Sequence, residues 1–195
     1  MGERHWKTVA ALLFILAREG FAQDSAQAVV LVAVHDSARV PQKELADART
    51  MATRVFASAG VRVEWQASGG ACPSDADEKF CVQVLLRARN PQSAPGSRRI
   101  MGMALAGDIQ RAVLSLYFDA VTAVARRYGS PRGQLLGLAL IHELGHVLLP
   151  PPSHSATGIM QPSWEGDDLR HVLAGDARFT EAQVLALRTR LARGQ

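Results

Sequence analysis

The sequence predicts an α+β fold with one β-sheet, and three observations support this class. Short segments rich in β-branched residues occupy the first part of the chain, an amphipathic helical segment interrupts them, and an almost wholly apolar helical segment follows them. The 195 residues, of which 48% are hydrophobic, suit one domain of ordinary size. We find no internal repeat, low-complexity tract or clear interdomain linker.

The first predicted elements are a strand, a helix and a second strand. Residues 26–36 (AQAVVLVAVHD) form a β-branched run long enough for one buried strand. A helix is predicted over 41–60, because it starts with Pro41, stops at Gly60 and carries an apolar stripe. Residues 61–65 (VRVEW) alternate as a half-buried strand does. The stripe of the helix consists of Leu45, Ala48, Ala52, Val55 and Phe56.

Three more strand candidates follow. Residues 81–89 (CVQVLLRAR) alternate again, and residues 90–97 (NPQSAPGS) have the composition of a loop. Residues 100–106 and 112–118 are the last two candidates, of which the first is weakened by Gly102. His35 and Asp36, at the end of the first strand, are expected to serve a loop.

Helices dominate the rest of the chain. Residues 119–129 predict a short helix that closes at Gly129. We expect Ser130 to be the N-cap of the next helix, with Pro131 at its first position, and this helix must end before the three prolines at 150–152.

The last predicted helix covers residues 180–194. Thr180 and Gln183 have the spacing of a capping box, in which each residue satisfies a backbone amide of the other. The order is therefore strand, helix, three or four strands, buried helix, and a smaller C-terminal part.

The N-terminus has the pattern of a secretory signal. Basic residues come first, an apolar run follows at 8–17, and small residues stand where a signal peptidase cuts. The run is about half the ~20 residues that span a bilayer, which favours a cleaved signal over an uncleaved anchor. We predict a signal peptide at 1–22 and a single domain at 23–195, with an N-terminal part at 23–149 and a C-terminal part at 150–195.

The chain has two cysteines, Cys72 and Cys81. Export makes a disulfide the natural interpretation. The alternative is a pair of metal ligands, although the spacing is not the C-x-x-C of a zinc knuckle. We therefore expect a secreted or periplasmic protein without stable membrane insertion.

The charge distribution argues against a polyanionic partner. The net charge is +4, but the basic residues are scattered, and the arginine pairs at 98–99 and 126–127 have no interleaved aromatic residues. We expect no binding to nucleic acid.

The segment HELGHVLLPPPSHSATGIM (142–160) carries the chemistry of the chain. On a helix, His142 and His146 share a face and can bind one metal ion, with Glu143 beside them. A catalytic zinc uses three protein ligands and one open position for water, and a glutamate serves as general base. The alternative is an apolar helix with structural histidines, but burying two histidines and a glutamate without partners is costly. A metal ion supplies that partner.

In this segment the sequence resembles the metzincin zinc peptidases, whose pattern is H-E-x-x-H-x-x-G-x-x-H followed by a tight turn that contains methionine. His142, Glu143 and His146 match the pattern, and residues 155–160 (SATGIM) resemble the Met-turn. The resemblance implies that Met160 lies beneath the metal as a structural floor. The glycine between Leu144 and His146 suits close packing of the helix.

Two positions depart from the family pattern. Leu149 stands where the family has glycine, and Pro152 stands where it has the third histidine. A histidine follows two residues later, and we expect this residue, His154, to be the third ligand. The competing candidates for a third ligand are Glu165, Asp167, Asp168 and His171.

The resemblance also implies an architecture. It predicts a mixed sheet of four to five strands with a backing helix, an active-site helix and a small C-terminal part that ends in a helix. Residues 100–106 would then be the edge strand over the cleft, where an extended peptide pairs by backbone hydrogen bonds. Trp164 is expected either to line a substrate pocket or to pack in the core. The passage from Ser153 onwards also resembles a group of uncharacterised secreted bacterial proteins of this type.

The sequence thus predicts a secreted zinc-dependent endopeptidase, a monomer that acts on a peptide or protein substrate with Zn²⁺ as cofactor. Two alternatives stay open. One is an exported binding module that keeps zinc for stability and has no catalytic activity. The other is a zinc hydrolase that acts on an amide other than a peptide, with the same chemistry.

Overall fold

In a computed structural model, the described residues are 28–67, 70, 72, 80–91, 100–105, 111–164 and 166–193. The predicted signal peptide and most of the 90–97 loop lie outside them. The strands are β1 (Ala28–Asp36), β2 (Val61–Trp65), β3 (Phe80–Arg87), β4 (Gly102–Ala104) and β5 (Arg111–Tyr117). The helices are α1 (Gln42–Ser58), α2 (Phe118–Tyr128), α3 (Arg132–Leu148), α4 (Gly166–His171), which continues into a π-helical turn (Val172–Asp176), and α5 (Glu181–Ala192).

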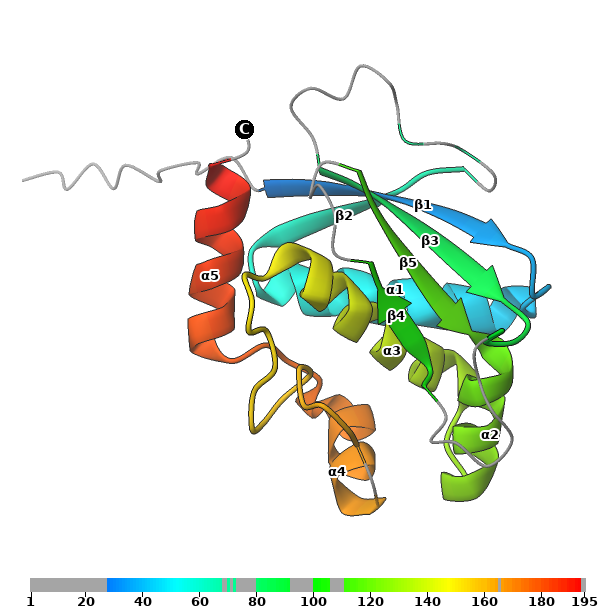
Figure 1. Cartoon of the computed structure of the whole chain (residues 1–195). Coiled ribbons are helices and arrows are strands. Elements are labelled where there is room, and N and C mark those ends of the chain that lie inside the picture. The colour runs from blue at the N-terminus through cyan, green and yellow to red at the C-terminus, as the bar shows by residue number, and fades with distance from the viewer. Residues whose placement is uncertain are drawn as a thin grey trace, which may run out of the picture.

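The strands form one mixed sheet in the order β2-β1-β3-β5-β4, as Figure 1 shows. The first four of these strands are parallel, whereas β4 runs antiparallel to β5 at the edge. The predicted α+β class, the mixed sheet and the edge position of the 100–106 segment are confirmed. The edge strand is shorter than predicted: β4 covers Gly102–Ala104, and Met101 and Leu105 on either side each share one backbone hydrogen bond with β5.

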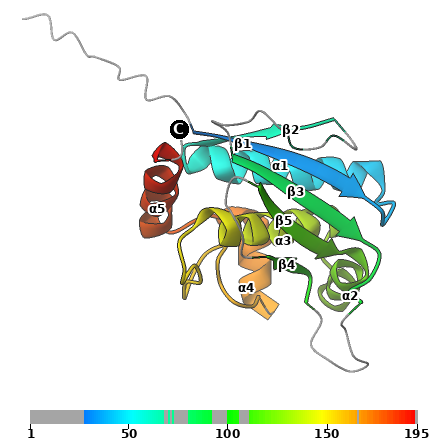
Figure 2. The ribbon, with the colours of Figure 1, turned by 45° about the horizontal axis from the view of Figure 1, so that its top comes forward.

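Helices α1 and α3 lie against the same face of the sheet, with α2 and α5 at opposite ends of the molecule (Figure 1, Figure 2). The predicted stripe of α1 is buried except for Leu45, which is half-buried. Glycines on α3 let the two helices approach closely: a Cβ atom at Gly137 would lie 3.1 Å from the Cα atom of Ala48. Almost every side chain of α3 is buried, so this helix has a fixed position in the core.

The start of α3 differs from the prediction. The N-cap is Pro131, which makes no side-chain capping hydrogen bond, so the assignment of Ser130 as N-cap was wrong. The amide of Ser130 donates to the carbonyl of Ala125 and belongs to the end of α2, where Gly129 has φ 64°. Helix α4 was not predicted, because it has six residues and only one of them is buried.

The end of the chain agrees with the prediction. Helix α5 begins with the capping box of Thr180 and Gln183, in which both reciprocal hydrogen bonds are present. A disulfide joins Cys72 to Cys81 at the start of β3, with the two Cα atoms 5.7 Å apart. In the part of the chain described above, no helix has the length and apolarity that crossing a membrane requires.

Candidate metal centre

Helix α3 presents two histidines and a glutamate to one side of the core. His142 and Glu143 are only 8% and 7% exposed, and His146, one turn later, is half-buried. The Nε2 atoms of His142 and His146 lie 3.0 Å apart. The helical spacing therefore directs both imidazoles to one point, as the sequence predicts.

Each imidazole is oriented by a partner on its other nitrogen. The Nδ1 atom of His142 lies 3.0 Å from the carbonyl oxygen of Ile159, which only accepts, so this nitrogen carries the proton and Nε2 has the lone pair. The Nδ1 atom of His146 lies 2.6 Å from the hydroxyl of Ser153. With both Nδ1 atoms engaged, both Nε2 atoms are available to a metal ion.

The third histidine arrives from the segment after α3. One ring nitrogen from each of His142, His146 and His154 lies within 4.8 Å of the other two. Ligands about 2.0–2.1 Å from a tetrahedral zinc lie about 3.3–3.4 Å from each other, so the three nitrogens fit such an ion after small side-chain adjustments. His154 is exposed, unlike the other two.

The electrostatics at His142 and His146 favour neutral rings. Burial lowers the pKa of His142 from 6.5 to about 4; the hydrogen bond to Ile159 raises it, and the charges of His146 and His154 lower it further. Burial, together with the charge of His154, also lowers the pKa of His146. A metal binds imidazole only in its neutral form, which this environment maintains.

Glu143 faces the edge strand β4. Burial raises the pKa of its carboxyl group from 4.5 to about 7, and a hydrogen bond from the backbone of Ala104 acts in the opposite direction. A Cβ atom at Gly102 would lie 2.8 Å from Oε1 of Glu143, so glycine makes room for this carboxylate. A group with a pKa near neutrality is well suited to accept and return a proton.

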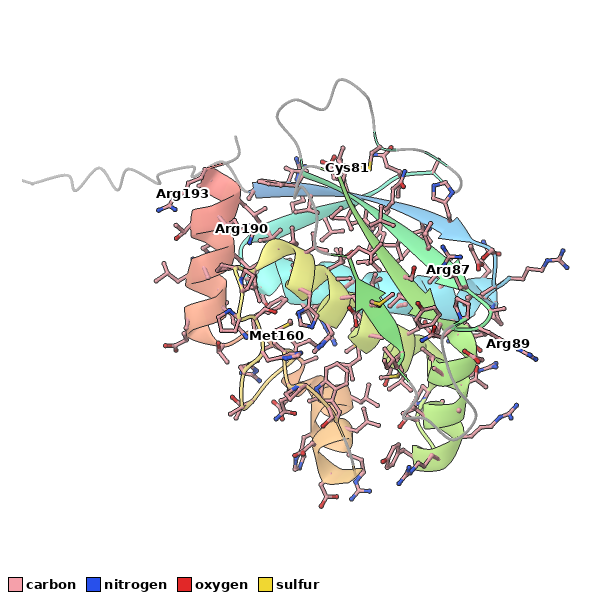
Figure 3. The ribbon with its side chains drawn as sticks, viewed as in Figure 1. Cys81, Arg87, Arg89, Met160, Arg190 and Arg193 are labelled. Atoms are coloured by element: carbon pink, nitrogen blue, oxygen red, sulfur yellow. A yellow bond between two sulfur atoms is a disulfide. The ribbon has the colours of Figure 1, made fainter. Side chains whose placement is uncertain are left out.

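Met160 is fully buried and directly follows Ile159, whose carbonyl contacts His142. Its label in Figure 3 marks the segment that leads from α3 to α4. A Cβ atom at Gly145 would overlap the sulfur of Met160, so the glycine on α3 allows this contact. The carbonyl of Met160 accepts a hydrogen bond from the amide of Ser155, 3.0 Å away, which closes the turn.

The competing third ligands lie elsewhere. Asp167, Asp168 and His171 are exposed on α4 and outside the histidine group, and Glu165 falls outside the described residues. Trp164 packs edge-on against His142, with 4.9 Å between ring centroids, and lines the cleft.

The histidines open into a cleft of about 1210 Å³. Besides the titratable residues Glu143, His142, His146 and His154, the lining includes the charged residues Arg127 on α2 and Arg190 on α5. Figure 3 labels Arg190. The lining consists of residues 100–105, Ala112, Ala123, Val124, Arg127, Tyr128, Ala139, His142, Glu143, His146, Val147, Leu149, Pro151, Pro152, Ser153, His154, Pro162, Ser163, Trp164 and Arg190.

Sequence reasoning missed the residues that support the ligands. Ser153 and the β4 backbone at Ala104 carry no sequence signal for this role, because their contacts depend on tertiary structure. Gln183 did carry a signal, as part of the capping box, but its amide also reaches the ligand segment, with 3.0 Å to the carbonyl of Ser153.

Comparison with solved structures gives a likeness of fold. The structure is similar to the crystal structure of archaemetzincin from Methanopyrus kandleri, with a TM-score of 0.52 and 16% sequence identity over 87% of this chain and 98% of that chain. This likeness supports the metzincin-like fold that the sequence predicts. Scanning protein-family models and searching curated proteins gave no match.

Proposed function

We propose that this protein is an exported zinc-dependent endopeptidase. The observation that carries the proposal is the convergence of His142, His146 and His154 beside the buried carboxylate of Glu143, at the base of a cleft. Three imidazoles leave a fourth coordination position open, which is the arrangement of catalytic rather than structural zinc.

Zinc bound to these histidines would supply Lewis acidity, which makes water nucleophilic near neutral pH. Glu143 is then the general base: its Oε atom takes a proton from the attacking water and returns it to the leaving amine nitrogen. Ala104 holds the carboxylate by its backbone, and Gly102 leaves space for it. The carbonyl of Ile159, which accepts from His142, and the hydroxyl of Ser153, which contacts Nδ1 of His146, keep the imidazoles in place.

The substrate we propose is an extended peptide. Strand β4 ends the sheet and has no strand partner on its outer side in the described part of the chain. Since β4 lines the cleft next to Glu143, a peptide paired with its backbone passes over the histidine cluster. Arg127 and Arg190 add positive charge to the lining of the cleft.

The proposal of export rests on the predicted signal at 1–22 and on the disulfide between Cys72 and Cys81, which persists in an oxidising compartment. We propose that the mature chain acts as a monomer on peptides or proteins outside the inner membrane.

The test is the Glu143→Gln protein, purified from 23 onwards and assayed with a broad peptide library. We expect hydrolysis to fall about 10²–10⁴-fold while one zinc per chain is retained, because only the general base is lost. The matched control is Glu181→Gln, on the exposed start of α5, which should cleave like the wild type.

Other outcomes of this assay identify the alternatives. Zinc binding without any cleavage by the wild-type protein would favour a zinc-stabilised binding module. Cleavage of non-peptide amides alone would favour the amide hydrolase. Unchanged peptide hydrolysis by Glu143→Gln would refute the role of Glu143.

A further inference from the structure

Gln183 is a buried polar residue whose side chain reaches from helix α5 to the metal-ligand segment. It is 9% exposed and lies far along the chain from that segment. Its Nε2 atom donates to the carbonyl oxygen of Ser153 at 3.0 Å and to the hydroxyl of Ser155 at 3.1 Å. One amide group therefore holds both chain neighbours of His154.

The same side chain also closes the capping box of α5. Its Oε1 atom accepts from the amide of Thr180 at 3.0 Å, while the hydroxyl of Thr180 accepts from the amide of Gln183 at 3.3 Å. Both N–H groups and the oxygen of the Gln183 side chain are thus engaged. Because the oxygen must face the Thr180 amide, the NH₂ group must face the ligand segment.

The two serines connect this amide to the rest of the centre. The hydroxyl of Ser153 contacts Nδ1 of His146, and the amide of Ser155 donates to the carbonyl of Met160. The three prolines before Ser153 have no amide hydrogen, so they cannot anchor this part of the segment by donating. His154 itself is exposed and lacks the packing that fixes His142.

We infer that Gln183 is a positioning residue of the metal centre, which sets the orientation of His154 through its two chain neighbours and that of His146 through Ser153. The inference rests on the proposed metal site. It makes α5 part of that site: the docking of this helix and the binding of the metal support each other. Outer-sphere partners of metal ligands change metal affinity by about 10–100-fold when they are removed.

Two variants separate this role from helix capping. Gln183→Glu keeps an oxygen for the Thr180 amide but loses the NH₂ group that holds Ser153 and Ser155. Thr180→Ala removes the other half of the capping box, which weakens the start of α5, and leaves the Gln183 side chain in place.

The measurements are zinc affinity, by competition with a chelator, and the visible absorption of the cobalt-substituted proteins. We expect Gln183→Glu to bind zinc about 10–100-fold more weakly with an altered cobalt spectrum. Thr180→Ala should keep the wild-type affinity and spectrum. Ser155→Ala, which removes one acceptor and leaves the helix intact, should weaken zinc binding less than Gln183→Glu, and it provides the test if that variant fails to fold.

If Gln183→Glu keeps the wild-type zinc affinity and cobalt spectrum, the inference is overturned while the proposed function stands. If Gln183→Glu does not fold, the same result for Ser155→Ala overturns the inference. Equal weakening by Thr180→Ala would overturn it as well, because capping would then explain the effect. A wild-type protein that binds no zinc would instead overturn the proposed function.

Discussion

Helix α3 and the segment from Leu149 to Trp164 both supply histidines to the candidate metal centre, but they hold them differently. On α3, His142 is 8% exposed in a helix that packs against α1 and the sheet. In the following segment, His154 is exposed, and its chain neighbours are held by hydrogen bonds from Gln183.

This difference indicates how the metal centre is assembled. A side chain fixed by core packing keeps its position whether or not metal is bound, because moving it would open a cavity. A side chain held by a few hydrogen bonds at the surface gains much of its order from the metal. We therefore expect the α3 side to be preformed and the order of the exposed residues around His154 to depend on zinc.

The largest expected effect comes from removing zinc. With free zinc at about 1,000 times its dissociation constant, chelation should lower the free energy of unfolding by about 4 kcal/mol. Hydrogen exchange should locate the change: amides next to His154, such as that of Ser155, should lose protection, whereas β1, β3 and α3 should stay protected. Uniform loss of protection would contradict a preformed α3 side.

Removing single ligands tests the same contrast. His142→Ala and His154→Ala should each weaken zinc binding by more than about 100-fold, beyond the range of outer-sphere partners. In the metal-free state only His142→Ala should be destabilised, by about 1–3 kcal/mol, because it leaves the carbonyl of Ile159 without its buried partner.

His154→Ala, at an exposed position, should change metal-free stability by about 0.5 kcal/mol or less. Chemical denaturation of both metal-free variants checks these values, with exposed His171→Ala as the control. Equal destabilisation by both ligand variants would show that the two regions are held alike.

The pH dependence of the unfolding free energy tests whether the α3 side chains, Glu143 above all, stay buried in the metal-free protein. Burial raises the pKa of Glu143 to about 7, so the folded protein binds this proton more tightly than the unfolded chain, whose value is near 4.5. The stabilisation that protonated Glu143 contributes is fully present below pH 4.5 and is lost as the pH rises through 7. His142, with its pKa lowered to about 4, acts in the opposite direction between pH 4 and 6.5.

Comparing the wild-type protein with Glu143→Gln isolates the contribution of Glu143 to the pH dependence of stability, because both proteins contain His142. From pH 5 to pH 8, metal-free wild type should lose roughly 2–3 kcal/mol of unfolding free energy relative to Glu143→Gln. Urea denaturation at each pH gives this difference. A difference that stays constant would mean that Glu143 is hydrated in the metal-free protein.

The same contrast explains what the sequence could predict. Helix α3 and the shared direction of His142 and His146 follow from helical periodicity, which local sequence determines. The position of His154 depends on the path of three prolines and on contacts with α5, so the sequence narrows the third ligand only to a few candidates. The approach of Ala104 to Glu143 depends on strand register, and helix α4 lacks an apolar stripe that periodicity can detect.

The smallest expected effect concerns the contact that joins the two regions. A Cβ atom at Gly145 would overlap the sulfur of the fully buried Met160 and lie 3.4 Å from Cε1 of Phe179. Overpacking of this kind costs about 1–3 kcal/mol, and the better helix propensity of alanine returns up to about 1 kcal/mol. Gly145→Ala should therefore lower the unfolding free energy by about 1–2 kcal/mol.

A double-mutant cycle with Met160→Ala assigns the cause of this loss. In the Met160→Ala protein the sulfur is absent, so Gly145→Ala should be neutral or slightly stabilising there. If Gly145→Ala costs the same in both backgrounds, then α3 and the turn around Met160 do not meet through this pair. The metal and the contacts of His142 with Ile159 and of His146 with Ser153 would then link α3 to the following segment.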